Sequence, residues 1–275
     1  MPCSMKAMFA STAAAAMLLL TACGQDRGSG GDVPEGLENQ SLKAERASVD
    51  DRQGPVLATD LFIRETSPTL DFVWHAPPEI AGAPGALSSM RAEADTARAE
   101  MQKEAREFSQ MLAEEGQDPR QLSYRQDWTL GYETPGLMNF TSETYRYDGG
   151  AHGMTTFDSL FWDKEAEAAV DRSALFVNWP QARERIASLF CENLDRMRAD
   201  RRGGEVGDDG PGFSDCPDVT DFPWALSNGG IGEPALTVLV EPYAAGPYAE
   251  GSYEVTIPLS DGLRGAMKTV YVPAG

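Results

Sequence analysis

The sequence has few of the residues and motifs on which most catalytic centres depend. It contains only two histidines, His75 and His152, among 275 residues, so a histidine-rich metal site is excluded. It has no G-x-S-x-G nucleophile elbow, no H-E-x-x-H zinc helix, no P-loop and no G-x-G-x-x-G dinucleotide motif. We therefore expect a protein without a metal, a cofactor or a catalytic centre.

Basic residues are also scarce. Lys and Arg total 23 against 43 Asp and Glu, which gives a net charge of -20 at pH 7. A surface this acidic argues against nucleic acid and anionic lipid as ligands, and it favours a basic protein, a cationic peptide or metal cations. Solubility and self-repulsion alone would also account for the charge.

No apolar run reaches the length of about 20 residues that a membrane-spanning helix needs. The stretch from Ala7 to Leu20 instead suits the apolar part of a signal peptide. It ends in Leu20-Thr21-Ala22-Cys23, which resembles the lipobox of bacterial lipoproteins, whose cysteine is acylated and becomes the first residue. We expect residues 1–22 to be a cleaved signal and Cys23 to anchor the chain to a membrane. An ordinary signal cleavage, with Cys23 incidental, is the alternative.

The residues after Cys23 indicate which membrane and how the anchor connects to the fold. Gly24 stands where an Asp would favour retention in the inner membrane of a Gram-negative cell, so we expect the outer membrane, facing the periplasm. Residues 23–55 are rich in glycine and charge and have few large apolar side chains, so they cannot bury enough surface to fold. We expect them to form a flexible tether.

Two cysteines remain after the signal and the anchor are set aside. Cys191 and Cys216 form an even pair in a chain that we expect to reach an oxidising compartment. A disulfide between them would close a loop of about 25 residues and stabilise the fold by roughly 3 kcal/mol. Two buried free thiols are the alternative.

The periodicity of apolar residues predicts an α+β fold, with antiparallel sheet regions packed against two long amphipathic helices. Apolar residues of the first helix recur every three or four positions on one stripe, which suits a core face better than a partner-binding face. We expect a small N-terminal β-hairpin–helix domain at 56–120 and a C-terminal α+β domain at 121–275. The expected strands are 60–64, 70–75, 122–128, 138–147, 154–162, 235–240 and 251–258, and the expected helices are 87–115 and 179–201.

Two loops have unusual compositions. Three glycines fall within five residues in Tyr145-Arg146-Tyr147-Asp148-Gly149-Gly150-Ala151-His152-Gly153, which implies positive φ angles or a close backbone approach. A second loop, residues 241–251, presents two tyrosines on a backbone restricted by proline and glycine, which suits recognition of protein or glycan. Tight turn geometry held by hydrogen bonds is the alternative for both loops. The candidate binding residues are Tyr147, Asp148, Gly149, Gly150, His152, Tyr243 and Tyr248.

An acidic segment surrounds Cys216. Its carboxylates are the kind of ligand that calcium binds, but their spacing does not match an EF-hand loop. A solvated acidic loop explains them better than a calcium site does, so we predict no metal site. The residues concerned are Asp208, Asp209, Asp215, Asp218 and Asp221.

The two loop motifs resemble the C-terminal domain of RsiV-type proteins, a family of mostly uncharacterised exported domains that is also attached to peptidoglycan deacetylases of the PdaC type. The resemblance rests on Y-x-G-G-A-H-G with Phe157 and Ala174-Leu175-Phe176 after it, and on P-Y-A-A-G-P-Y-A-E-G-S-Y-E-V-T-I-P near the end. Residues 57–115 are similar to the small domain that usually precedes it. The resemblance implies an α+β binding domain without a catalytic centre.

The same resemblance frames the expected function. In RsiV the domain is the extracellular part of an anti-sigma factor and binds lysozyme, but here the residues before Cys23 resemble a cleaved signal, so the anti-sigma role does not transfer. We expect a lipid-anchored envelope protein that binds a lysozyme-type hydrolase or peptidoglycan. The alternatives are a structural or assembly lipoprotein without a soluble ligand, and a wall-modifying enzyme that uses His152 and Asp148.

Overall fold

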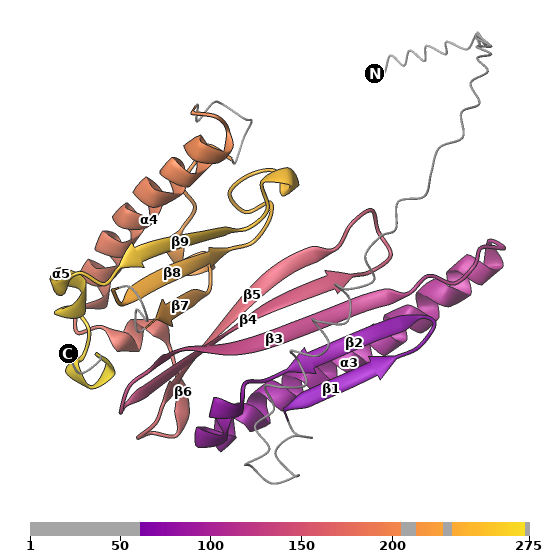
Figure 1. The fold of residues 1–275 in the computed structure, drawn as a ribbon, viewed down its shortest axis with the longest axis horizontal. Helices are drawn as coiled ribbons and strands as arrows, with labels where there is room; N and C mark the ends of the chain where they lie inside the picture. Colours follow the sequence, from indigo (N-terminus) through magenta and orange to yellow (C-terminus); the bar gives the residue numbers. More distant parts are fainter. Residues whose placement is uncertain (1–60, 205–212, 228–232, 273–275) are drawn as a thin grey trace, which may run out of the picture. The chain divides into compact units, whose positions relative to one another are not determined.

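The computed structural model describes residues 61–204, 213–227 and 233–272 (Figure 1). Over these residues the chain forms two β-sheets and two long helices, so the predicted α+β class is confirmed. The predicted signal peptide, the Cys23 anchor and the tether of residues 23–55 lie outside the described residues, and they stay predictions.

The described elements form a six-stranded sheet of order β1-β2-β3-β4-β5-β6 and a three-stranded sheet of order β7-β8-β9. The strands are β1 (Phe62–Thr66), β2 (Leu70–His75), β3 (Leu122–Glu133), β4 (Leu137–Tyr147), β5 (Met154–Asp163), β6 (Ala168–Val170), β7 (Trp224–Ser227), β8 (Ala235–Val240) and β9 (Tyr253–Pro258). The helices are α3 (Pro84–Glu114), α4 (Trp179–Arg201) and the short α5 (Asp261–Arg264).

Helix α3 connects β2 to β3 and covers one face of the larger sheet. β2 and β3 run parallel, so the chain has to cross over between them, and α3 makes that crossing. The other neighbouring strands of this sheet pair antiparallel, as predicted. The apolar stripe of α3 is buried at Met90, Ala94 and Met101, in one cluster with Phe72 and Trp74 of β2. The stripe is therefore a core face.

The boundaries of the two long helices follow their local sequence. α3 begins at Pro84, three residues before the predicted start at Leu87. Proline is favoured in the first turn of a helix because the N–H that it lacks has no intrahelical partner there. α4 has the predicted bounds, and the Asn178 side chain accepts a hydrogen bond from the backbone N–H of Gln181 at its start.

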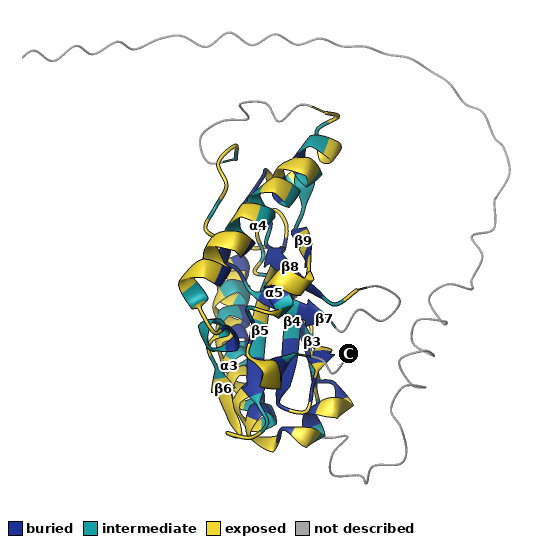
Figure 2. Cartoon of the chain, turned by 90° about the vertical axis from the view of Figure 1, so that its left-hand side faces the viewer, coloured by how far each residue is buried: buried dark blue, intermediate teal, exposed yellow. Residues whose placement is uncertain are grey.

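Helix α4 packs on the smaller sheet and forms the second core. Ile186, Phe190 and Leu194 lie four residues apart and are fully buried. Alternate residues of β9 are buried in the same cluster, while the residues between them are exposed. The outer side of α4 is largely exposed (Figure 2).

Buried polar contacts join the two sheets. Asn139 of β4 is fully buried, and its Oδ1 accepts a hydrogen bond of 2.7 Å from the backbone N–H of Leu226 in β7. Ser159 of β5 donates through Oγ to the carbonyl oxygen of Trp224 at 2.6 Å. The smaller sheet therefore covers part of the face of the larger sheet that α3 leaves open. The larger sheet itself contains strands from both sides of the predicted domain boundary at residue 120, because β2 pairs with β3.

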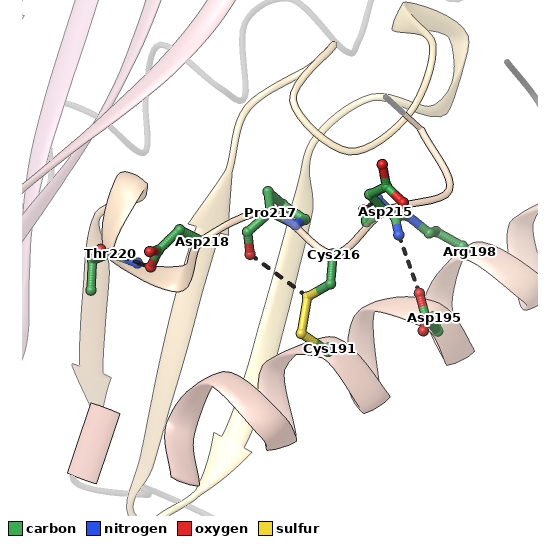
Figure 3. The surroundings of a disulfide bond; sticks show 8 residues. All are labelled: Cys191, Asp195, Arg198, Asp215, Cys216, Pro217, Asp218 and Thr220. Carbon is green, nitrogen blue, oxygen red and sulfur yellow. Dashed lines mark hydrogen bonds and ion pairs between the residues drawn. A yellow bond between two sulfur atoms is a disulfide. The ribbon is translucent and has the colours of Figure 1, made fainter. Parts of the chain in front are cut away.

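The predicted disulfide between Cys191 and Cys216 is confirmed (Figure 3). Its Cα atoms are 5.5 Å apart, which is within the ordinary range. The bond connects α4 to the segment that leads into β7. Among the described residues, we find no helix with the length and apolar character needed to cross a membrane.

Candidate binding site at the His152 and Tyr243–Tyr248 loops

The loop between β4 and β5 is shaped by two of its glycines. Gly149 has a φ of +91°, and a side chain on it would collide with the Phe108 ring of α3. A side chain on Gly153 would collide with the Tyr145 ring. The expected close backbone approach is therefore present at both positions. Gly150 differs, because it has no positive φ and the nearest atom to an added Cβ is 3.4 Å away.

The loop between β8 and β9 holds an aromatic residue in an unusual backbone conformation. Tyr243 has a φ of +70°, a region that costs a non-glycine residue about 1–2 kcal/mol. Its side chain is nevertheless 47% exposed. Strain of this kind persists only where surrounding contacts fix the backbone, and it is found most often at functional sites.

The two loops lie against one another through three aromatic side chains. The rings of His152 and Tyr248 are stacked with centroids 3.8 Å apart, and the ring of Tyr243 lies 5.5 Å from that of Tyr248. The Tyr248 hydroxyl donates to the Gly153 carbonyl oxygen at 2.9 Å. Residues about ninety positions apart in the sequence thus form one surface, which we call the aromatic cluster (His152, Tyr243 and Tyr248).

The hydrogen bonds of His152 define the tautomer of its ring. Nδ1 lies 3.0 Å from the Gly153 carbonyl oxygen, which can only accept, so Nδ1 carries the proton. Nε2 lies 3.3 Å from the Tyr243 hydroxyl and accepts from it when the ring is neutral. Both ring nitrogens therefore engage groups other than Asp148, the residue that the enzyme hypothesis pairs with His152.

Asp148 instead lines a pocket on the other side of its loop. The pocket has a volume of about 300 Å³ and lies against the Phe108 ring of α3. Arg146 forms an ion pair with Glu104 there. Tyr147, the last residue of β4, is half-buried. Of the candidate residues predicted in the β4–β5 loop, Asp148 thus lines the pocket and only His152 belongs to the aromatic cluster. The lining residues of the pocket are Glu104, Glu107, Phe108, Leu122, Arg146 and Asp148.

A buried arginine on α4 holds the β8–β9 loop by a hydrogen bond. Arg198 of α4 is fully buried, and its Nε donates to the Ala245 carbonyl oxygen at 2.9 Å. Its Nη2 donates to the Asp215 carbonyl oxygen at 3.1 Å, next to the disulfide, and its Nη1 pairs with Asp195 (Figure 3). Arg198 therefore connects the disulfide segment to the tyrosine loop.

An ion pair closes the same loop at its other end. Arg202 donates to both carboxylate oxygens of Glu250, at 2.8 Å and 3.0 Å, and both side chains are largely buried. The Arg202 guanidinium holds the pKa of the Glu250 carboxyl below its ordinary value. A side chain on Gly246 would collide with Glu250. Together with Arg198, this pair fixes the backbone that presents Tyr243 and Tyr248.

These supporting residues were missed by the sequence analysis, although one signal was present. Arg198 continues the four-residue spacing of Ile186, Phe190 and Leu194, so it falls on the apolar side of α4 where a charge needs a partner. Nothing in the local sequence identifies its acceptors, because Ala245 lies in a loop 47 residues away.

The acidic segment near Cys216 is held by hydrogen bonds within the protein. Asp218 accepts from the backbone N–H and the hydroxyl of Thr220, at 2.9 Å and 2.8 Å, and it forms an ion pair with Arg183. Asp208 and Asp209 lie outside the described residues. In the ranges that the structure describes, no three His, Cys, Asp or Glu side chains come together as possible metal ligands.

Comparison with known proteins gives a family model that matches one segment and a similar fold over most of the chain. Residues 68–155 match the family model described as Deacetylase PdaC. A member of the DUF3298 family from Bacteroides fragilis has a similar structure, with a TM-score of 0.50 and 13% identity, covering 76% of this chain and 92% of that one. These findings are consistent with a PdaC/DUF3298-type domain. The resemblance predicted from the loop motifs is confirmed at that level.

Two further comparisons complete this result. A DUF3298 family protein from Pseudomonas aeruginosa PAO1 aligns with a TM-score of 0.45 and 18% identity, covering 78% of this chain and 96% of that one. The search of curated proteins finds no match. The PdaC match extends across the predicted boundary at residue 120 and includes the loop of Gly149 and His152.

Proposed function

We propose that this protein is a non-enzymatic, lipid-anchored envelope protein that binds a cell-wall-related ligand through the aromatic cluster. The ligand is a lysozyme-type hydrolase or peptidoglycan itself. The observation that carries the proposal is the exposed Tyr243 ring, which is held beside His152 and Tyr248 despite its unfavourable backbone conformation. Rigid, exposed tyrosines give contact area at low cost in conformational entropy.

The charge of the chain supports the hydrolase version. A net charge of -20 attracts a basic protein and accelerates its association at low salt. The resemblance to exported domains, and the match to the Deacetylase PdaC family model, support a ligand in the cell wall. The lipobox at Cys23 supports a lipid anchor, and Gly24 after it supports the outer membrane, facing the periplasm. A Cys23→Ala variant that no longer incorporates labelled palmitate would support the anchor.

The function is tested by binding to purified peptidoglycan sacculi and to a lysozyme-type enzyme at low salt. Tyr243→Ala should weaken binding of the true ligand about ten-fold, because the interface then loses an exposed aromatic anchor. Phe62→Ala is the matched control, since Phe62 is 43% exposed but lies on β1. Absence of binding to either ligand would favour a structural or assembly lipoprotein.

A deacetylase is the second candidate, favoured only by the description of the family that matches residues 68–155. An assay for acetate release from acetylated wall glycan tests it directly. Activity that disappears in His152→Ala would replace the binding proposal with an enzymatic one.

A further inference from the structure

The open face of the larger sheet carries aromatic residues beside the aromatic cluster. Ser142 and Thr144 of β4 are buried on the α3 side, so Tyr145 points to the opposite face, where it is 41% exposed. Tyr145 pairs with Thr155 and Glu143 pairs with Phe157, so Phe157 lies on the same face as Tyr145, diagonally across the two strands.

Gly153 connects this face to the loops. The Tyr145 ring packs directly over Gly153, whose carbonyl oxygen accepts the hydrogen bond from Tyr248. Tyr145 of β4 and Tyr248 of the β8–β9 loop therefore contact the same residue. Tyr145 is thus connected to the aromatic cluster through Gly153, and Phe157 lies on the same sheet face as Tyr145. We call these five residues the aromatic strip: Phe157, Tyr145, Tyr248, His152 and Tyr243.

Carboxylates border the aromatic strip. Glu143 is exposed beside Phe157, and Glu241 stands two residues before Tyr243. Arg125 lies opposite Tyr145 on the neighbouring strand, but its guanidinium pairs with Asp127 at 2.6 Å. The faces of the tyrosine rings carry negative charge density, which attracts cations further. A ligand that suits this surface has flat apolar faces and positive charge.

We propose that the aromatic strip binds a β-linked amino-sugar chain that carries free amino groups. The C–H faces of successive pyranose rings pack on the aromatic rings, and the ammonium groups lie near Glu143 and Glu241. This inference rests on the proposed function and specifies its ligand class. It also makes Tyr145 part of the site. Tyr145 is not among the candidate binding residues predicted from the sequence.

The test is calorimetric titration of the folded, disulfide-bonded chain with two probes, a hexamer of glucosamine and a hexamer of N-acetylglucosamine. The glucosamine hexamer should bind more tightly at low salt, and its advantage should shrink as salt is added. Tyr145→Ala and Tyr243→Ala should each weaken binding about five-fold, while Phe62→Ala leaves it unchanged. Glu143→Gln should reduce the advantage of the glucosamine hexamer. Thermal melting of each variant verifies that the fold is intact.

Either of two results overturns the inference. One is equal or tighter binding of the acetylated hexamer, and the other is full affinity of the Tyr145→Ala variant. Failure of the proposed function looks different, because sacculi and the lysozyme-type enzyme would then also fail to bind. Binding of either of them that depends on Tyr243 but not on Tyr145 would preserve the proposed function and reject the aromatic strip.

Discussion

At the scale of single residues, the candidate site depends on side chains and glycines that are not themselves exposed to a ligand. Gly149 and Gly153 let the backbone of the β4–β5 loop pass directly over two aromatic rings, and Arg198 donates hydrogen bonds to two loop carbonyl groups. These residues hold the exposed Tyr243 and the half-buried Tyr248 in place. Changes at the supporting positions should therefore affect stability as well as binding.

Substitution of Gly149 by alanine should destabilise the fold by about 1–3 kcal/mol, because the position combines a positive φ with contact to Phe108. Gly150→Ala is the control, since that residue has neither constraint and should change stability by less than about 0.5 kcal/mol. Urea unfolding of both variants measures the difference. Equal losses would show that the Gly149 backbone is not constrained as described.

Replacement of Arg198 by methionine should cost about 2–4 kcal/mol, because it leaves the carbonyl oxygens of Ala245 and Asp215 without their donor. Arg196→Met removes an exposed ion pair with Glu192 from the same helix and should cost less than about 1 kcal/mol. Ligand binding should weaken in the first variant only. A stable Arg198→Met protein with normal binding would contradict the supporting role of this residue.

At the scale of elements, α3 and β5 bring two carboxyls together on the helix side of the larger sheet. Partial burial raises the pKa of Glu93, and the neighbouring charge of Asp158 raises it further. Partial burial also raises the pKa of Asp158, against a hydrogen bond from Ser142 that lowers it. The packing of α3 on the sheet therefore makes the ionised forms of Glu93 and Asp158 unfavourable at neutral pH.

Asp158→Asn should consequently raise the melting temperature at pH 7 by a few degrees at most. The pKa of Asp158 is higher in the folded protein than its ordinary value of 3.8. The contribution of Asp158 to stability is therefore complete below pH 3.8 and is lost as the pH rises through its folded-state pKa. The gain should therefore vanish near pH 3. Melting curves across this range test the effect, with Asp95→Asn at an exposed position of α3 as the control. A destabilised Asp158→Asn variant at pH 7 would contradict the claim that the Asp158 charge destabilises the fold.

The elements that the sequence predicted are those with long periodic patterns. α4 was predicted within its observed bounds, because its apolar residues, capping Asn178 and Pro180 all agree. β6 and β7 were missed because strands of three and four residues are too short for alternation to stand out. The parallel pairing of β2 with β3 depends on how α3 packs, which no local pattern records.

The candidate site was predicted in its parts but not in its assembly. His152, Tyr243 and Tyr248 were identified from loop composition, whereas their mutual contact depends on how the two sheets join through Asn139 and Ser159. Tyr145 begins the glycine-rich motif but was not among the candidate binding residues, because the strand pattern alone does not show what its side chain contacts. Its importance appears once Gly153 is seen to pack beneath it.

At the scale of the whole molecule, the disulfide connects the second core to the loop system. Cys191 lies on α4, and the backbone next to Cys216 accepts a hydrogen bond from Arg198, which also holds Ala245. The disulfide thus constrains both the unfolded chain and the site. Its loss should lower the stability of the fold and weaken ligand binding.

The double variant Cys191→Ser and Cys216→Ser should lose about 3 kcal/mol of stability and bind ligand more weakly. The reduced wild-type protein should behave in the same way. Chemical unfolding with and without a reductant measures the stability, and binding of the proposed ligands measures the effect on the site. Unchanged binding in a folded double variant would show that Arg198 holds the tyrosine loop without help from the disulfide.

The position of β1 at the edge of the larger sheet has a mechanical consequence. Within the part of the chain that the structure describes, a pull between the N-terminal side and a bound ligand first loads β1, an edge strand with β2 as its one neighbour in the sheet. A pull directed away from the sheet loads the β1–β2 hydrogen bonds one after another, which is the weakest arrangement. β1 should detach at low force and lengthen the chain, while β2 to β9 remain folded and keep hold of the ligand.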